Sequence, residues 1–66
     1  MNKSDTTLRI DATFGLKVKS GDKIHKGQHI NTNQEQAATS PISGTVKSIH
    51  FDPDNHELVI VISPSG

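Results

Sequence analysis

The sequence predicts a small all-β domain, and three observations support that prediction. Apolar and polar side chains alternate over the first twenty residues, every apolar run is short, and each run ends at glycine, proline, aspartate or asparagine. No segment has a helical period longer than one turn. A small all-β chain must protect its sheet edges, and closure achieves this. We therefore expect a flattened barrel, or barrel-sandwich hybrid, of about six or seven short strands.

Length and composition narrow the classes of protein that this chain can belong to. Its 66 residues make one domain (1–66), with a core over about residues 6–62. The chain has no cysteine, which excludes disulfides and thiolate metal sites. It also lacks a run of about 18 apolar residues and an apolar signal region. We expect a cytoplasmic protein without membrane insertion.

The charge pattern argues against nucleic acid as a partner. Seven basic and seven acidic residues give a net charge of zero, and Phe14 and Phe51 are the only aromatic side chains besides histidine. Nucleic-acid binders usually show a basic excess and stacking aromatics. Four lysines nevertheless fall close together beside His25, and we call them the lysine strip: Lys17, Lys19, Lys23 and Lys26. A solvated surface is the simpler interpretation of this strip, and a docking site for an acidic partner is the alternative.

Side-chain alternation predicts the strands. Even positions are apolar from 8 to 18, which predicts one buried face and strands near 6–13 and 15–19, separated by a bend at Gly15. The run 57–62 is apolar on both faces and β-branched, which is typical of a central strand. Eleven residues form the predicted core: Leu8, Ile10, Leu16, Val18, Ile24, Ile30, Ile42, Val46, Leu58, Ile60 and Ile62. Val59 and Val61 then point the other way.

Turn residues predict where the chain changes direction. Gly21 and Asp22 form one turn, in which the glycine can take a positive φ and the carboxylate can accept backbone N–H groups. Gly27 and Gly44 are predicted corners, and we expect Gly44 to need a conformation that is costly for other residues. Pro41 ends the polar segment 31–40, which we interpret as a loop.

The second half contains one irregular strand and the strongest turn signal. Val46 and Ile49 have opposite parity, so a bulge is expected near residues 47–48 if both face the core. The sequence DPDN, residues 52–55, has proline and turn-capping side chains where a tight turn needs them. A hairpin between residues 45–51 and 57–62 follows.

Two motifs together resemble a known fold. Residues 16–30, LKVKSGDKIHKGQHI, are similar to the "V-x-x-G-D-x-V-x-x-G-Q-x-L" element of barrel-sandwich hybrid domains, the biotinyl/lipoyl-like fold. Residues 40–49, SPISGTVKSI, are similar to their "A-P-x-x-G-x-V-x-x-I" element. In carriers of this family, the hairpin between these motifs presents the lysine that receives biotin or lipoate. Here that stretch is NTNQEQAATS, residues 31–40, and it contains no lysine.

Because this lysine is missing, the chain resembles non-carrier members of the family more than carriers. The short turn at 52–56 is similar to that of domains in the C subunit of Rnf-type electron-transport complexes and the A subunit of sodium-pumping NADH–quinone reductases. RNA polymerase β′ subunits contain a similar insert. The resemblance implies that the domain packs and docks inside a larger assembly. It also implies that the domain binds no cofactor and catalyses no reaction.

The histidines are the remaining candidates for chemistry. His25 and His29 have a metal-binding spacing only on a helix, which Gly27 argues against. His50 and His56 flank a turn, where they can hold zinc or nickel weakly with Asp52 or Asp54. Solvated turn histidines are the favoured interpretation. No nucleophile elbow or phosphate loop is present, so we do not expect an enzyme.

The sequence thus favours a non-catalytic structural or protein-interaction module, and the resemblance implies an association with an electron-transport complex. A degenerate or atypical biotin/lipoyl carrier is the alternative, and an enzyme ranks third. We expect a monomer or weak dimer whose partner contact includes the strand 58–62, with Val59 and Val61 on its outer face. The lysine strip is the competing contact site.

Overall fold

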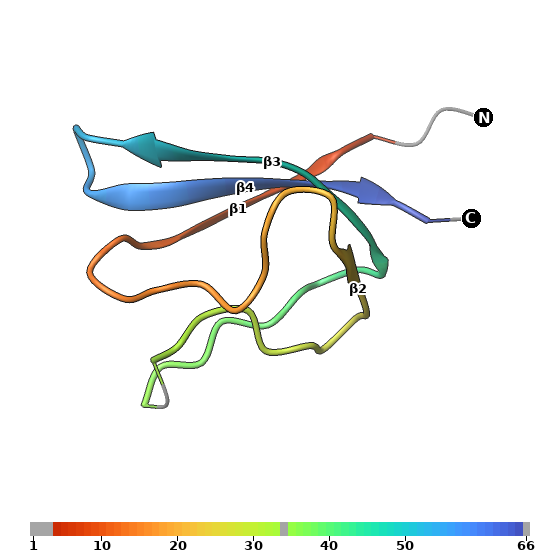
Figure 1. Cartoon of the computed structure of the whole chain (residues 1–66), viewed down its shortest axis with the longest axis horizontal. Helices are drawn as coiled ribbons and strands as arrows, with labels where there is room; N and C mark the ends of the chain where they lie inside the picture. The colour runs from red at the N-terminus through yellow and green to blue at the C-terminus, as the bar shows by residue number, and fades with distance from the viewer. Residues whose placement is uncertain (1–3, 34, 66) are drawn as a thin grey trace.

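Four strands form one antiparallel sheet in the computed structural model, which describes residues 4–33 and 35–65. They are β1 (Thr6–Asp11), β2 (Lys23–Ile24), β3 (Gly44–Asp52) and β4 (Glu57–Pro64), in the spatial order β1-β4-β3-β2. The sheet curls into half a barrel, and the loops lie on one side of it (Figure 1). The described chain contains no helix, and the all-β prediction is confirmed. No described segment is long, helical and apolar enough to cross a membrane.

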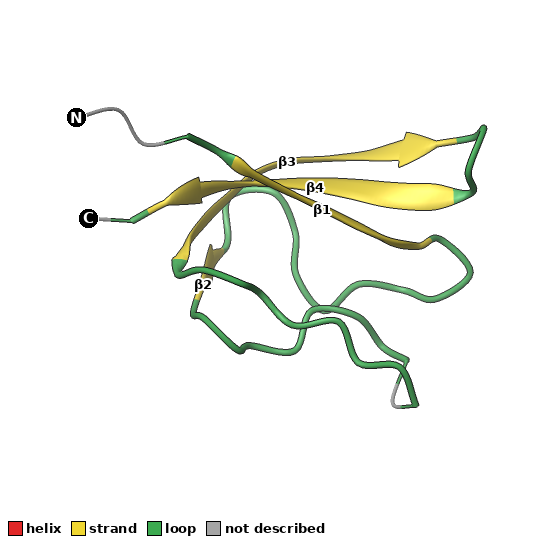
Figure 2. Cartoon of the chain, turned by 180° about the vertical axis from the view of Figure 1, so that it is seen from behind, coloured by secondary structure: helices red, strands yellow, loops and turns green. Residues whose placement is uncertain are grey.

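The predicted number of six or seven strands is wrong, because much of the chain forms turns where ladders were expected (Figure 2). The expected strand at 15–19 is reduced to a single bridge between Leu16 and Asn31. Side chains use the N–H groups that a ladder needs. The N–H of Thr13 donates to the Asp11 carboxylate, and the N–H of Gly15 donates to Thr32 Oγ1. Such bonds from backbone N–H groups to side chains compete with sheet formation.

The predicted core is confirmed almost entirely. Seven apolar side chains form its buried centre: Ile10, Val18, Ile24, Ile30, Val46, Ile60 and Ile62. The remaining predicted core residues, Leu8, Leu16, Ile42 and Leu58, are partly buried against it. Phe14 departs from the predicted buried face and is 37% exposed, because the chain leaves β1 in a turn after Asp11. Two of the seven central side chains, Val18 and Ile30, come from the loops, so the loops form part of the core.

The hairpin of β3 and β4 has the predicted irregularity. The pairing register shifts between Val46 and Ser48, so Val46 lies opposite Ile62 and Ile49 lies opposite Ile60. The extra residue, Lys47, therefore lets two apolar residues of opposite parity face the same side of the sheet. β4 lies between β1 and β3, which confirms the prediction of a central strand.

Two of the predicted glycine corners have the expected geometry. Gly21 has φ +95° and Gly27 has φ +85°, and the Asp22 carboxylate accepts the N–H of Lys19 at 3.0 Å. Gly44 differs, because it lacks a positive φ. It is instead buried against β4, where a Cβ atom would overlap the carbonyl oxygen of Ser63. Glycine is thus required at position 44 by close strand approach, and the expectation of a costly φ there is wrong.

The outer face of β4 differs from the predicted open patch. Val59 is only 5% exposed, although it points away from the main core. Its direct cross-strand neighbours are Arg9 on β1 and His50 on β3. Both edges of β4 are paired, so residues 58–62 offer no free backbone for a partner strand. The predicted contact through an open β4 edge and an exposed Val59 is therefore corrected.

Candidate functional site

Residues 28–40 form a short hairpin, and this is the stretch that contains no lysine. The N–H of Ile30 donates to the Ala38 carbonyl at 2.8 Å, and the N–H of Ser40 donates to the Gln28 carbonyl at 2.9 Å. A bridge between His29 and Thr39 lies between these bonds. The polar segment 31–40 is thus a loop as predicted, with a defined pairing at its base. Pro41 follows the buried Ser40, whose hydroxyl donates to the Ile42 carbonyl.

Asn31 anchors this hairpin from the inside. Asn31 is only 6% exposed, and its Oδ1 accepts the Ala38 N–H at 3.0 Å. Nδ2 donates to the Gln36 carbonyl at 3.2 Å. Sequence reasoning missed Asn31, because nothing in a run of six polar residues indicates which one turns inward. A buried amide with these two bonds fixes the path of the loop.

The Asn31 bonds also select the tautomer of the neutral His29 ring. Nε2 of His29 lies 3.0 Å from Asn31 Oδ1, which already acts as an acceptor. The neutral ring therefore carries its proton on Nε2 and leaves Nδ1 as an acceptor. Lys17 Nζ lies 3.5 Å from that Nδ1 and donates to it. The amine that contacts the hairpin thus comes from the lysine strip and lies at the hairpin's base.

The tip of the hairpin carries acceptor groups and no amine. Asn33 Oδ1 accepts the N–H groups of Glu35 and Gln36 at 3.0 and 3.2 Å, which shapes the turn. Glu35 and Gln36 are exposed. Residues 27–46 contain no lysine. A carboxylate and a primary amide cannot form the amide bond that attaches biotin or lipoate to a carrier.

Three lysines of the strip lie on two turns and on β2, and Lys17 lies beside the Leu16–Asn31 bridge. Residues 19–22 form one turn, closed by the Asp22 N–H and the Lys19 carbonyl at 3.1 Å, and residues 25–28 form the next. All four lysines are exposed, and among the described residues none of them forms an ion pair. Four lysines and one aspartate give residues 17–26 a net charge of +3. Lys47, by contrast, pairs with Asp5 at 2.9 Å.

Negative charge is concentrated at the β3–β4 turn. Asp11, Glu57 and Asp52 lie side by side in register across β1, β4 and β3. Asp54 follows in the turn, so this end carries four carboxylates and one guanidinium, that of Arg9, for a net charge of −3. A chain with no net charge therefore separates its charges into a basic segment and an acidic end. This arrangement depends on strand register, which the sequence alone does not disclose.

Arg9 connects the acidic end across the sheet. Its Nη1 lies 2.9 Å from Asp52 Oδ2 and 3.3 Å from Glu57 Oε1. Because Arg9 is on β1 and Asp52 is on β3, the side chain crosses β4 and covers Val59. The Asn55 side-chain amide and then the Arg9 guanidinium lower the pKa of Asp52. Three carboxylates in one row otherwise repel one another.

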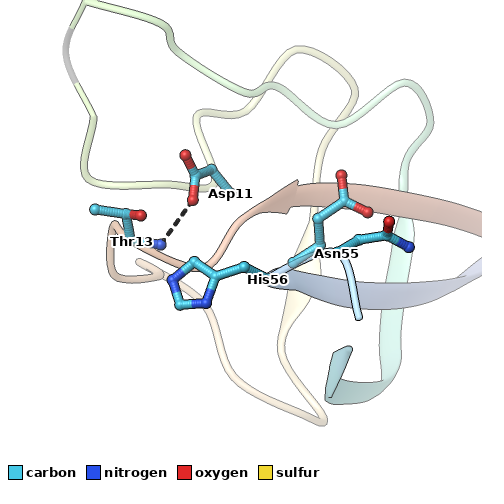
Figure 3. A pocket seen from close by; sticks show the side chains of 5 residues that line it. Asp11, Thr13, Asn55 and His56 are labelled. Carbon is cyan, nitrogen blue, oxygen red and sulfur yellow. Dashed lines mark hydrogen bonds between the residues drawn. The ribbon is translucent and has the colours of Figure 1, made fainter. Parts of the chain in front are cut away.

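An open hollow of about 350 Å³ lies beside this end. Asp11, Thr13, Asn55, His56 and Glu57 line it, and the Asp11 carboxylate points towards the Thr13 N–H (Figure 3). That hydrogen bond lowers the pKa of Asp11. A carboxylate with a lowered pKa is a weaker base at neutral pH. The hollow is therefore better suited to attract a positively charged group than to transfer a proton.

The histidines do not converge on a metal site. His50 lies opposite Val59 on the outer face, whereas His56 has φ +53° and stacks edge-on against Phe51 with ring centroids 5.7 Å apart. Asp52 is engaged by Arg9 and Asn55. Within residues 4–33 and 35–65, no group of three histidine, aspartate or glutamate side chains is placed to hold a metal ion.

No protein-family model, curated protein or solved structure matches this chain. The likeness to barrel-sandwich hybrid domains therefore rests on the two sequence motifs.

Proposed function

We propose that this chain is a non-catalytic protein-interaction module on a biotinyl/lipoyl-like scaffold. The observation that carries the proposal is the hairpin of residues 28–40. It is fixed by the buried Asn31, and its tip displays Glu35 and Gln36 in place of a lysine. A carrier needs an exposed amine on a tight turn, so that the attached arm can move between active sites. This hairpin has the turn and lacks the amine.

The lysine strip is the docking surface of the proposed module. Its four ammonium groups have no internal ion-pair partner in the described chain, so they are available to an acidic protein. Unpaired charge of one sign speeds encounter with a complementary surface and fixes its orientation. The attraction acts over about 8 Å at physiological ionic strength. We therefore expect a cytoplasmic protein partner with an acidic face, in an assembly such as an electron-transport complex.

The intact mass of the purified chain distinguishes this proposal from the degenerate-carrier alternative. The chain is expressed with active biotin and lipoate ligases, and the intact mass of the purified product is measured. We expect the unmodified mass of about 7.1 kDa. A quantitative biotin or lipoate adduct on any lysine, including Lys17 at the hairpin base, contradicts the proposal. A genuine carrier domain expressed in the same cells serves as the control for ligase activity.

A further inference from the structure

The outer half of β3 has an unpaired backbone edge. β2 pairs only with Gly44 and Thr45, and within the described chain no strand lies beside residues 48–52 on the side away from β4. Figures 1 and 2 show this part of β3 at the margin of the sheet from both sides. Open strand edges are templates for pairing with another strand.

The register identifies which backbone groups face outward. Ala12 donates its N–H to the His56 carbonyl, so that pair is hydrogen-bonded, and hydrogen-bonded pairs alternate along an antiparallel ladder. The even residues of β4 therefore bond to β1 and the odd ones bond to β3. Accordingly, the residues of β3 that bond to β4 are 48, 50 and 52. The N–H and C=O groups of Ile49 and Phe51 point to the open side.

We propose that a second copy of this chain pairs with this edge, β3 against β3, about a two-fold axis at His50. In that register Ile49 lies opposite Phe51 of the second copy, and Phe51 lies opposite its Ile49. All four residues then use both outward backbone groups, and four inter-chain hydrogen bonds form. A shift of two residues in the direction of the turn places Pro53, which has no N–H, opposite Ile49. Three strands from each copy then form one six-stranded sheet.

The side chains along this edge of β3 are complementary to those of the same edge in a second copy. Phe51 is 50% exposed, the most exposed large apolar side chain described, and the pairing covers it with Ile49 of the second copy. On the opposite face His50 meets His50, and Ser48 meets Asp52. The open edge of β1 is less suitable, because its outward residues include the charged Arg9 and Asp11, and charged edges resist pairing.

The geometry also limits the strength of the contact. The bulge at Lys47 ends the free edge on one side, and Pro53 ends it on the other. Five residues bury far less than the roughly 1,600 Å² of a standard interface. The dimer is therefore weak, with a dissociation constant on the order of 0.1–1 mM. The contact is independent of the lysine strip, so it goes beyond the proposed docking function and stands or fails separately.

The test is concentration-dependent amide shift mapping of the full chain, with sedimentation equilibrium as the measure of mass. Amides of residues 48–52 should shift as the concentration rises to roughly 2 mM. Phe51→Ser should raise the dissociation constant at least about tenfold, because the largest newly covered side chain is lost. His50→Lys should do the same, since two ammonium groups then meet on the axis, whereas His50→Gln should associate like the parent.

Two control variants locate the contact. Phe14→Ser removes the other exposed aromatic side chain and should leave association unchanged. Thr7→Pro removes an outward N–H of β1 and should also have no effect. The proposal is overturned if the chain stays monomeric throughout, if Thr7→Pro abolishes association, or if the shifts are confined to residues 17–26. Amide spectra establish that each variant is folded before its mass is measured.

Discussion

Substitution of Gly44 gives the clearest prediction about the stability of this fold. Gly44 lies in β3 between two partners, opposite Ile24 of β2 and opposite Pro64 of β4. A Cβ atom at this position would overlap the Ser63 carbonyl oxygen and come within 3.1 Å of Pro64 Cα. These neighbours are backbone atoms in a sheet, so they cannot rotate away as a side chain can. Gly44→Ala must therefore move β3 and β4 apart.

The expected loss follows from this enforced separation. Forcing extra atoms into a packed site costs about 1–3 kcal/mol, and a core this small rarely supplies more than about 3–5 kcal/mol of stability. For a domain of this size, 1 kcal/mol lowers Tm by about 4–8 °C. We expect Gly44→Ala to melt roughly 4–24 °C below the parent, by the same scaling, and Gly44→Val to be largely unfolded at 37 °C.

The matched control is Gly15→Ala, measured by the same circular-dichroism melts and urea titrations. At Gly15 the nearest atoms to a new Cβ are the Thr32 side-chain atoms at 3.6 and 3.7 Å, an ordinary contact distance. Its φ is not positive, so alanine should be neutral or stabilise by up to about 1 kcal/mol. If Gly44→Ala and Gly15→Ala melt together, close approach of β3 and β4 is not what requires glycine at position 44.

Three further predictions concern the corner, the hairpin and the acidic end. Gly27→Ala should cost about 1–2 kcal/mol from left-handed backbone alone, since no atom lies within 4 Å of a new Cβ; Gly27→Asn should cost less in the same urea titration. Asn31→Ala should cost about 1–3 kcal/mol in the same titration, because the Ala38 N–H loses its acceptor and the Gln36 carbonyl loses its donor. The pKa of Asp52 is below its ordinary 3.8 in the folded chain, so its contribution is present at neutral pH and is lost as pH falls below about 5. Asp52→Asn should therefore flatten the decline of Tm between about pH 5 and pH 2, and an unchanged acid limb contradicts that assignment.

The sequence predicted the core well because burial follows simple chemistry. Branched apolar residues such as Ile24 and Ile30 are isolated among polar neighbours, so each has one obvious destination. The bulge at Lys47 was also predictable, since Val46 and Ile49 can both reach the core only if one residue is added between them. These inferences use local pattern and need no knowledge of the topology.

The strand count and the outer face were not predictable in the same way. Whether residues 12–22 form a ladder depends on bonds such as that from Gly15 to Thr32, which join positions far apart in the sequence. Val59 was expected to be exposed because no apolar layer remained to cover it. Its cover is the polar side chain of Arg9, which crosses β4 to reach Asp52. Long cationic side chains often cover apolar surface with their aliphatic stems.

The candidate site shows the same division. The lysine-free stretch and the lysine strip are visible in the sequence. The inward turn of Asn31 and the row of Asp11, Glu57 and Asp52 appear only once strands are paired. The positive φ of His56 was equally hidden, because most residues of a four-residue turn are free to take several conformations.

Amide shift mapping of the chain against an oligoglutamate peptide tests the docking claim most directly. We expect amide shifts concentrated at residues 17–26. The double variant Lys19→Glu with Lys23→Glu should lose binding. Lys47→Glu should retain it, because the parent side chain is already paired with Asp5. The binding should also weaken as salt is added. Shifts spread evenly over all lysines, or binding that survives the double reversal, would contradict a docking role for the lysine strip.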